Sequence, residues 1–314
     1  MCRHPRLWLC QQPTGAFAFA IALVFVAAIP ALVQADTNKI PHVGSKAIEH
    51  FQQYQYSSEN KAFAIAPGGT WSWVTEAISE EEAGKEALQG CQDNTQQKCV
   101  LYALNDRIVF DADSWSGLWG PYADATAASK AETGTRVGQR FPDLSWFDAE
   151  GKQHSVSAQK GKIVFLHFWG SWCPPCLREF PSLKDLNTKI QSLYPGDVEM
   201  KMLQLREPFT DSIDWAEQYD FTDMPLYDSG VKDNETSTLS LRDGSQVEDR
   251  SIARVFPSTY VIDRNGLVIF SHRGPVHDWL DYIVFFDHVV KNTKRSHTST
   301  ADKHHNKPGS NPGG

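Results

Sequence analysis

An alternation of apolar runs and amphipathic stretches dominates the chain between residues 138 and 292. The run at 163–169 is apolar at almost every position, which predicts a strand buried on both faces of a sheet. Strands alternating with helices predict an α/β fold with a mixed sheet flanked by helices. Besides the central strand, we expect an initial hairpin through 148–151, strands at 198–205, 258–262 and 267–270, and helices at 174–193, 212–219 and 276–290.

A smaller pattern of the same kind precedes it, over residues 45–111. One helix is predicted where Ile48, Phe51 and Tyr54 share a face. A second helix begins at Ser79, because the glutamates that follow favour the positive end of a helix dipole. With strands expected at 62–66, 98–104 and 107–110, the pattern predicts a small α/β domain.

Two further stretches lack a sustained period. Residues 112–137 are rich in Ala, Ser, Asp and Thr, which predicts a linker, although Trp115 and Trp119 are expected to pack on one of the domains. Residues 293–314 are polar and contain Gly and Pro, which predicts a disordered tail.

Residues 1–35 have the pattern of an export segment. Arg3, His4 and Arg6 precede an apolar run over 16–33, which ends in small residues of the kind that precede signal peptidase cleavage. The run is slightly long for a signal peptide, so an uncleaved membrane anchor stays open as the alternative. Both interpretations place the rest of the chain outside the cytoplasm, in the periplasm or an equivalent space.

Four cysteines follow that segment, in two close pairs. Cys91 and Cys99 flank the end of a predicted helix, and a disulfide between them would strengthen a small core. Cys173 and Cys176 form a Cys-Pro-Pro-Cys run. An oxidising compartment permits a structural bond in the first pair and redox chemistry in the second.

The second pair lies where the buried central strand meets a helix. A cysteine at a helix N-terminus faces unpaired N–H groups, which favour the thiolate and lower the thiol pKa by ~1.5 to 2 from about 8.5. Pro174 and Pro175 suit the first helical turn, where N–H donors are not needed. Cys176, one turn on, lies within bonding reach and more deeply. We expect Cys173 to attack a substrate disulfide and Cys176 to resolve the mixed disulfide.

Several other classes of function are excluded. A net charge of −8 leaves no basic face for nucleic acid. A zinc site would need two more Cys or His at suitable spacing, and the domain lacks them. His304 and His305 are expected to be solvated, so we expect no metal and no cofactor. The Pro-x-x-x-Thr-x-x-Cys pattern of peroxide reduction is also absent.

The run Gly161-Lys-Ile-Val-Phe-Leu-His-Phe-Trp-Gly-Ser-Trp-Cys-Pro-Pro-Cys-Leu-Arg-Glu-Phe-Pro181 resembles the TlpA/ResA/CcmG group of thioredoxin-like reductases. The resemblance extends to 138–143 and 255–266, about half of the chain. It implies a thioredoxin-like fold and thiol-disulfide exchange. Members of the group are membrane-tethered or periplasmic, and many pass electrons to apocytochrome c or other oxidised proteins. It thereby implies exported disulfide-bearing partners and a membrane electron donor.

The resemblance also implies further site residues. Pro257 would form the cis peptide that faces the active site, and Glu179 would modulate the thiols, with a solvated helix residue as the alternative. Trp169 and Trp172 would shield the disulfide, although Trp169 is compatible with the core. Phe256 stands where the group commonly has valine or isoleucine, which leaves partner identity open.

The sequence departs from the pattern of this group at two other positions. Gly170 stands where alanine is more usual, and His167 stands where many members have asparagine. We expect His167 to be a satisfied strand residue. The segment 223–254 is longer and more polar than in simpler relatives, and the sequence does not decide between a partner surface and a neutral loop.

These observations predict an exported protein-disulfide reductase with a Cys-Pro-Pro-Cys dithiol, with cytochrome c maturation as one role. Whether the protein reduces or oxidises its substrates depends on its reduction potential, which ranges from about −270 to about −120 mV in thioredoxin-fold proteins. The alternative is a non-catalytic, redox-sensitive scaffold that binds partners through the thioredoxin fold and the N-terminal domain.

Overall fold

The computed structural model describes residues 40–120, 122–235 and 237–301, with side chains as far as residue 293. The segment expected to direct export, residues 1–35, and the end of the tail, 302–314, lie outside these ranges. Within them, no helix has both the length and the apolar character needed to cross a membrane.

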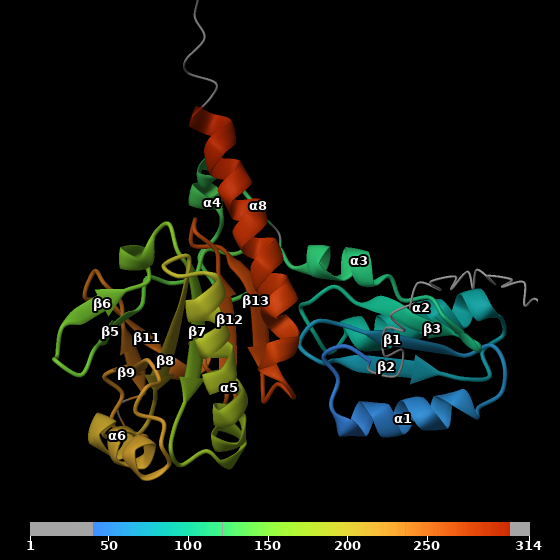
Figure 1. Ribbon diagram of the computed structural model, residues 1–314, viewed down its shortest axis with the longest axis horizontal. Coiled ribbons are helices and arrows are strands. Elements are labelled where there is room, and N and C mark those ends of the chain that lie inside the picture. The colour runs from blue at the N-terminus through green and yellow to red at the C-terminus, as the bar shows by residue number, and fades with distance from the viewer. Residues whose placement is uncertain (1–39, 121, 236, 302–314) are drawn as a thin grey trace, which may run out of the picture. The chain divides into compact units, whose positions relative to one another are not determined.

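The larger sheet has seven strands in the order β13-β12-β7-β8-β9-β5-β6 (Figure 1). The central strand β7 is buried at all seven positions, as its apolar run predicts. It pairs in parallel with β8 and antiparallel with β12, so the sheet is mixed. Its strands are β5 Ser145–Phe147, β6 Gln153–Ser155, β7 Ile163–Trp169, β8 Val198–Gln204, β9 Leu226–Asp228, β12 Ser258–Ile262 and β13 Val268–Arg273.

Helix α5 follows β7 directly and packs against β8 and α8 (Figure 1). The strands β10 and β11 form a separate two-stranded ribbon. The elements other than the seven strands in this part are η2 Ser157–Gln159, α5 Pro174–Leu193, α6 Phe209–Gln218, β10 Thr238–Ser240, β11 Gln246–Glu248, α7 Asp249–Ile252, η3 Trp279–Tyr282 and α8 Ile283–Ala301.

The last helix is longer than the sequence predicts. It was expected to end near residue 290, and α8 continues to Ala301. The disordered tail expected over residues 293–314 stays a prediction. The polar stretch 291–301 contains neither Gly nor Pro, so nothing in it breaks a helix that the preceding apolar turns have started.

A four-stranded antiparallel sheet in the order β2-β1-β3-β4 precedes these elements. Side chains of β1 alternate between two apolar clusters: Phe63 and Ile65 lie with the aromatic face of α1, whereas Ala62 and Ala64 lie with α2. Strand β2, which follows the turn at Pro67-Gly68-Gly69, was not predicted. The elements are α1 Ser45–Gln55, β1 Ala62–Ile65, β2 Trp71–Val74, α2 Glu80–Gln92, β3 Val100–Leu104 and β4 Arg107–Ile108.

The stretch 112–137, which its composition predicts to be a linker, contains short helices. It forms α3 Ala112–Trp115, η1 Ser116–Leu118 and α4 Ala125–Lys130. The indole of Trp119 is fully buried and packs on Phe285 of α8, with ring centroids 4.4 Å apart. Over the described residues from Ile40 to Ala301, the chain is therefore one compact unit with a continuous core, because aromatic burial outweighs the polar composition of this stretch.

Candidate active site

Cys173 and Cys176 are joined in a disulfide, with their Cα atoms 5.3 Å apart. Cys173 is the N-cap of α5 and Cys176 lies in its first turn, three residues on. Cys173 is 3% exposed and Cys176 is not exposed at all. Of the two sulfurs, the one that caps the helix is therefore the one that a substrate meets first.

The start of α5 is organised around the sulfur of Cys173. Pro174 and Pro175 occupy the first two helical positions and carry no N–H. The first N–H of the helix belongs to Cys176, and it donates to Sγ of Cys173 over 3.3 Å. This hydrogen bond and the positive end of the helix dipole both favour a negative charge on that sulfur when the disulfide is reduced.

The loop before β12 lies beside the cysteine loop. The peptide between Phe256 and Pro257 is cis, and the next residue, Ser258, pairs with Phe168 near the end of β7. The rings of Phe256 and Trp172 are in edge-to-face contact, with centroids 5.0 Å apart. The structure thus brings the sequence-predicted residues Phe256, Pro257 and Trp172 together at one edge of the sheet.

The two tryptophans near the cysteines differ in their surroundings. Trp169 is fully buried and packs on Phe180, with ring centroids 4.5 Å apart, so it belongs to the core. Trp172 is 45% exposed, and its Nε1 donates to the carbonyl of Leu205 over 2.9 Å. A Cβ on Gly170 would lie 2.3 Å from that nitrogen. Glycine therefore allows the indole of Trp172 to fold back over the loop.

Glu179 lies on α5 one turn beyond Cys176 and is only 3% exposed, which contradicts the alternative of a solvated residue. Its Oε1 accepts the backbone N–H of Val276 over 2.6 Å and the indole N–H of Trp279 over 3.1 Å. Burial raises the pKa of Glu179 to about 8, although the two hydrogen bonds oppose part of the rise. A carboxyl group with that pKa can exchange a proton near neutral pH.

His167 contacts Glu179 from the central strand. Its Nδ1 is 2.8 Å from Oγ1 of Thr259, and its Nε2 is 3.9 Å from Oε2 of Glu179. Neither Nε2 nor Oε2 has a hydrogen-bond partner among the described residues. Burial lowers the pKa of His167 to about 3, so the ring is neutral. It lies in the strand as expected, but its ring is not fully satisfied, because Nε2 faces the buried carboxyl without a hydrogen bond.

A second buried carboxylate, Glu207, was not singled out from the sequence. It accepts the backbone N–H of Ser171 over 2.8 Å and the hydroxyls of Ser171 and Ser212, each over 2.5 Å. Ser171 directly precedes Trp172, so Glu207 fixes the loop that leads into the cysteines. Its position just beyond β8 could have indicated this role. Strand β8 runs parallel to β7, so the loops that follow the two strands lie at the same edge of the sheet.

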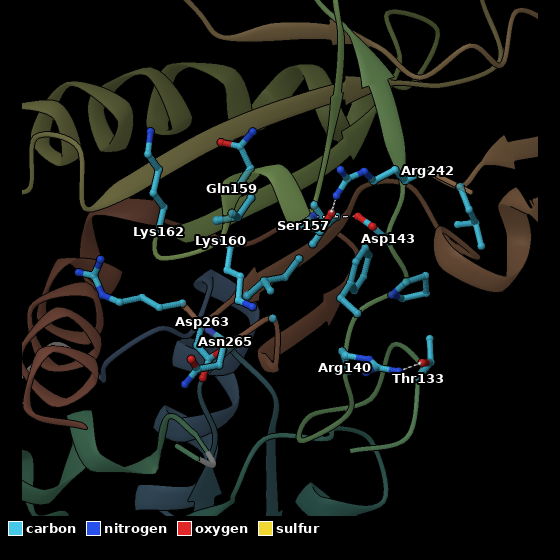
Figure 2. Close-up of a pocket in the computed structure, with 18 of the residues that line it drawn as sticks. Thr133, Arg140, Asp143, Ser157, Gln159, Lys160, Lys162, Arg242, Asp263 and Asn265 are labelled. Atoms are coloured by element: carbon cyan, nitrogen blue, oxygen red, sulfur yellow. Dashed lines mark hydrogen bonds between the residues drawn. The ribbon is translucent and has the colours of Figure 1, made fainter. Parts of the chain in front are cut away.

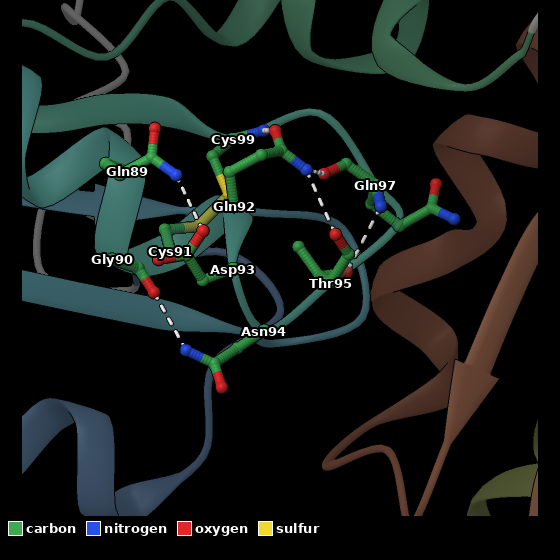
Figure 3. Close-up of a disulfide and its surroundings, with 9 residues drawn as sticks. All are labelled: Gln89, Gly90, Cys91, Gln92, Asp93, Asn94, Thr95, Gln97 and Cys99. Atoms are coloured by element: carbon green, nitrogen blue, oxygen red, sulfur yellow. Dashed lines mark hydrogen bonds between the residues drawn. A yellow bond between two sulfur atoms is a disulfide. The ribbon is translucent and has the colours of Figure 1, made fainter.

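The other cysteine pair, Cys91 and Cys99, is also bonded, with Cα atoms 6.2 Å apart (Figure 3). Cys91 lies in the last turn of α2, among alanine side chains. Figure 3 shows how the loop between the cysteines is held by its own polar side chains: Gln92 Nε2 donates to the carbonyls of Thr95 and Gln97, over 3.0 Å each.

One pocket lies away from the cysteines. Figure 2 shows residues that line this cavity of about 440 Å³, which lies where β7 begins and where β12 turns into β13. The cysteines follow the other end of β7, so the cavity and the disulfide lie at opposite ends of the sheet. Arg140, Lys160 and Arg242 are among its lining residues. Across the described ranges, no group of three or more His, Cys, Asp or Glu side chains is placed to hold a metal ion.

Comparisons with known proteins agree with this geometry. The model of the AhpC/TSA family matches residues 137–271. The thiol-disulfide oxidoreductase ResA of Geobacillus thermodenitrificans is 32% identical over 137 residues, which are 44% of this chain and 69% of the relative. The thioredoxin-like protein YneN of Bacillus subtilis is 28% identical over 152 residues, 46% of this chain and 76% of the relative.

Among solved structures, a secreted thiol-disulfide isomerase from Corynebacterium glutamicum is 18% identical, covers 50% of this chain and 86% of its own, and has a TM-score of 0.39. The family model and the mixed sheet confirm the predicted thioredoxin-like fold. Through residues 137–271, the chain belongs to the ResA-like thiol-disulfide oxidoreductases of the AhpC/TSA family.

Proposed function

We propose that the chain reduces disulfides of exported proteins, using Cys173 and Cys176 as its dithiol. The observation that carries the proposal is the N-cap position of Cys173, whose sulfur accepts the first N–H of α5 while Cys176 lies buried behind it. The thiolate is the reactive form of a thiol, and this position favours it.

The exchange has two steps. The thiolate of Cys173 attacks one sulfur of the substrate disulfide, forms a mixed disulfide and releases the other substrate sulfur as a thiolate. The thiolate of Cys176 then attacks Sγ of Cys173 and releases the second substrate thiol. Two electrons pass to the substrate and the pair ends as the disulfide, so a dithiol donor must reduce it again.

The neighbouring residues support these steps. Cys176 must lose its proton before it attacks, and Glu179, one turn away and with a pKa raised to about 8, is suited to accept it. The loop that contains Phe256 and Pro257 lies next to the cysteine loop, where a substrate backbone would bind. We assign a structural role to Cys91–Cys99, and we assign residues 45–111 to a small α/β region ahead of the thioredoxin-like one.

The export signature in residues 1–35 supports an extracytoplasmic location, with or without an anchor. Relatives named thiol-disulfide oxidoreductases support the exchange chemistry. A role in cytochrome c maturation rests on the resemblance to the TlpA/ResA/CcmG group.

The test is reduction of insulin by the dithiol form of the protein. Cys173→Ser should abolish it, and Cys176→Ser should accumulate the mixed disulfide. Full activity of Cys173→Ser would contradict the proposal. A reduction potential near −270 mV supports a reductase, whereas one near −120 mV indicates an oxidant. In cells, haem-binding apoproteins trapped on Cys176→Ser would support cytochrome maturation.

A further inference from the structure

Four arginines lie close, in sequence or in strand register, to the cysteine pair or to the cis proline. Arg178 lies on α5 two residues after Cys176, and Arg250 lies on α7. Arg254 lies three residues before the cis proline, and Arg273 pairs with Ser258 directly after it. All four are exposed.

These arginines differ from arginines elsewhere in the chain. Arg206 and Arg264 each bind an aspartate at 2.6 Å. In contrast, none of the four arginines around the site has an acidic partner within the part of the chain that the structure describes. In a chain with a net charge of −8, each of them thus carries a positive charge with no ion pair of its own among the described residues, while Arg273 lines a pocket that Asp93 also lines.

An apolar ridge lies between these charges. Trp172 and Val255 are each 45% exposed, and Phe256 between them contacts the ring of Trp172. The guanidinium of Arg250 lies over the ring of Phe256, 5.5 Å from its centroid, and donates to the carbonyl of Arg254 over 3.0 Å. Cations and apolar side chains therefore form one continuous surface.

A buried ion pair holds this surface in place. Asp249, at the start of α7, has no exposed surface and accepts two hydrogen bonds from Arg206, over 2.6 and 2.8 Å. The residue after Arg206 is Glu207, which fixes the cysteine loop through Ser171. Arg206 binds the α7 segment, which contains Arg250, and the adjacent Glu207 binds the loop that leads to Cys173. These two residues therefore connect the segment with the loop. Such fixed contacts are typical of a preorganised binding surface.

We propose that this surface selects extended polypeptide segments in which acidic side chains and an aromatic or aliphatic side chain flank the target disulfide. The inference rests on the proposed function and names its substrate class. Arginine binds carboxylates by charge-assisted hydrogen bonds, and the ridge buries an apolar side chain. The segment 223–254, which contributes Arg250 and Arg254 to this surface, is then a recognition element and not a neutral loop.

The test uses two synthetic peptides, each with one internal disulfide and one phenylalanine. They differ only in the residues that flank the cysteines, two glutamates in one and two lysines in the other. Single-turnover reduction by the dithiol form of the full protein gives a rate constant for each. We expect the acidic peptide to react roughly tenfold faster at low salt, and the ratio to fall toward one near 1 M salt.

Arg250→Gln/Arg254→Gln should remove most of this preference. The ratio of the two rates cancels any change in the reactivity of the thiol itself, so it reports recognition alone. The matched control is Arg242→Gln, which changes an exposed arginine at the cavity of Figure 2 and should leave the ratio unchanged.

Equal rates for the two peptides, or the same loss of preference in Arg242→Gln, would overturn the inference. The uncharged 2-hydroxyethyl disulfide separates this failure from that of the proposed function. If the wild-type protein reduces it but does not distinguish the peptides, only the recognition inference fails. If the protein reduces none of the three compounds, the proposed function fails with it.

Discussion

The two disulfides lie at opposite ends of their helices. Cys91 is in the last turn of α2, where carbonyl groups and the negative end of the dipole disfavour a thiolate. Cys173 caps the start of α5 and accepts an N–H from Cys176. The same covalent bond thus stands in two electrostatic settings, and only one of them favours the reactive form of the thiol.

Their neighbours differ as well. Cys91 and Cys99 lie in a cluster of small apolar side chains, with a loop fixed by Gln92. Cys176 is followed one turn later by the buried Glu179, which His167 approaches from β7. The comparison teaches that a short cysteine spacing does not by itself make a redox site. The helix end and a nearby proton acceptor provide the difference.

The largest expected effect is on activity. Cys173→Ser should lower the rate of insulin reduction by about 10³-fold or more, because among the described cysteines Cys176 is buried and Cys91 and Cys99 are bonded to each other. Cys91→Ser/Cys99→Ser should stay within about threefold of wild type when assayed at a temperature where both are folded. If the folded double variant also lost most of its activity, the first pair would not be purely structural, and the proposed difference between the two pairs would be wrong.

The next effect is on stability. Removing Cys91–Cys99 should lower the free energy of unfolding by about 2.5 kcal/mol, as expected from chain entropy for a short closed loop. Urea unfolding of the double variant, with Cys173–Cys176 kept oxidised, measures this difference. An unchanged midpoint and slope would show that the bond does not stabilise the fold.

Glu179 gives stability a pH dependence. Its pKa is about 8 in the folded protein against 4.5 in the unfolded chain, so between these values the folded state binds the extra proton and stability falls as the pH rises. His167, with a pKa lowered from 6.5 to about 3, acts in the opposite direction, but only below pH 6.5.

The window from pH 6.5 to 8 therefore isolates Glu179. Between pH 6.5 and 8, the free energy of unfolding of the oxidised wild-type protein should fall by about 2 kcal/mol more than that of Glu179→Gln. Chemical unfolding at several pH values compares the two slopes. Parallel slopes would mean that the carboxyl is ionised throughout, which would leave Glu179 without the proposed role in proton transfer.

The smallest effect concerns the loop before the cysteines. Gly170→Ala should cost about 1 kcal/mol, because the new Cβ displaces the indole of Trp172 from the carbonyl of Leu205. Tryptophan fluorescence and thermal unfolding detect the change. Gly117→Ala is the control, since its Cβ would meet only an ordinary contact at 3.9 Å. Equal effects in both variants would argue against a specific role for Gly170.

The sequence was most informative where local rules decide the structure. The apolar run of β7 and the prolines of α5 predicted both elements, with the bounds that the structure has. The helix capped by Ser79 was also predicted, because its first turn is acidic. The position of the cysteine pair at a strand-to-helix junction followed from these elements.

Contacts between distant segments could not be predicted in this way. The hydrogen bonds of Glu207 with Ser171 join residues 36 positions apart, and only the parallel pairing of β7 and β8 brings them together. The burial of Trp119 against α8 likewise depends on tertiary packing, which local composition does not report. Local sequence patterns were thus enough to predict where the cysteines lie along the chain. The residues that contact their loop depend on the topology of the sheet, which the local patterns do not determine.

The most direct test is the pH dependence of iodoacetamide alkylation at two thiols. One is Cys173 in Cys176→Ser, and the other is Cys91 in Cys99→Ser with Cys173–Cys176 kept oxidised. We predict that Cys173 reacts with an apparent pKa ~1.5 to 2 below about 8.5, and Cys91 with a value at or above 8.5. Equal values, or an unshifted value at Cys173, would contradict the account.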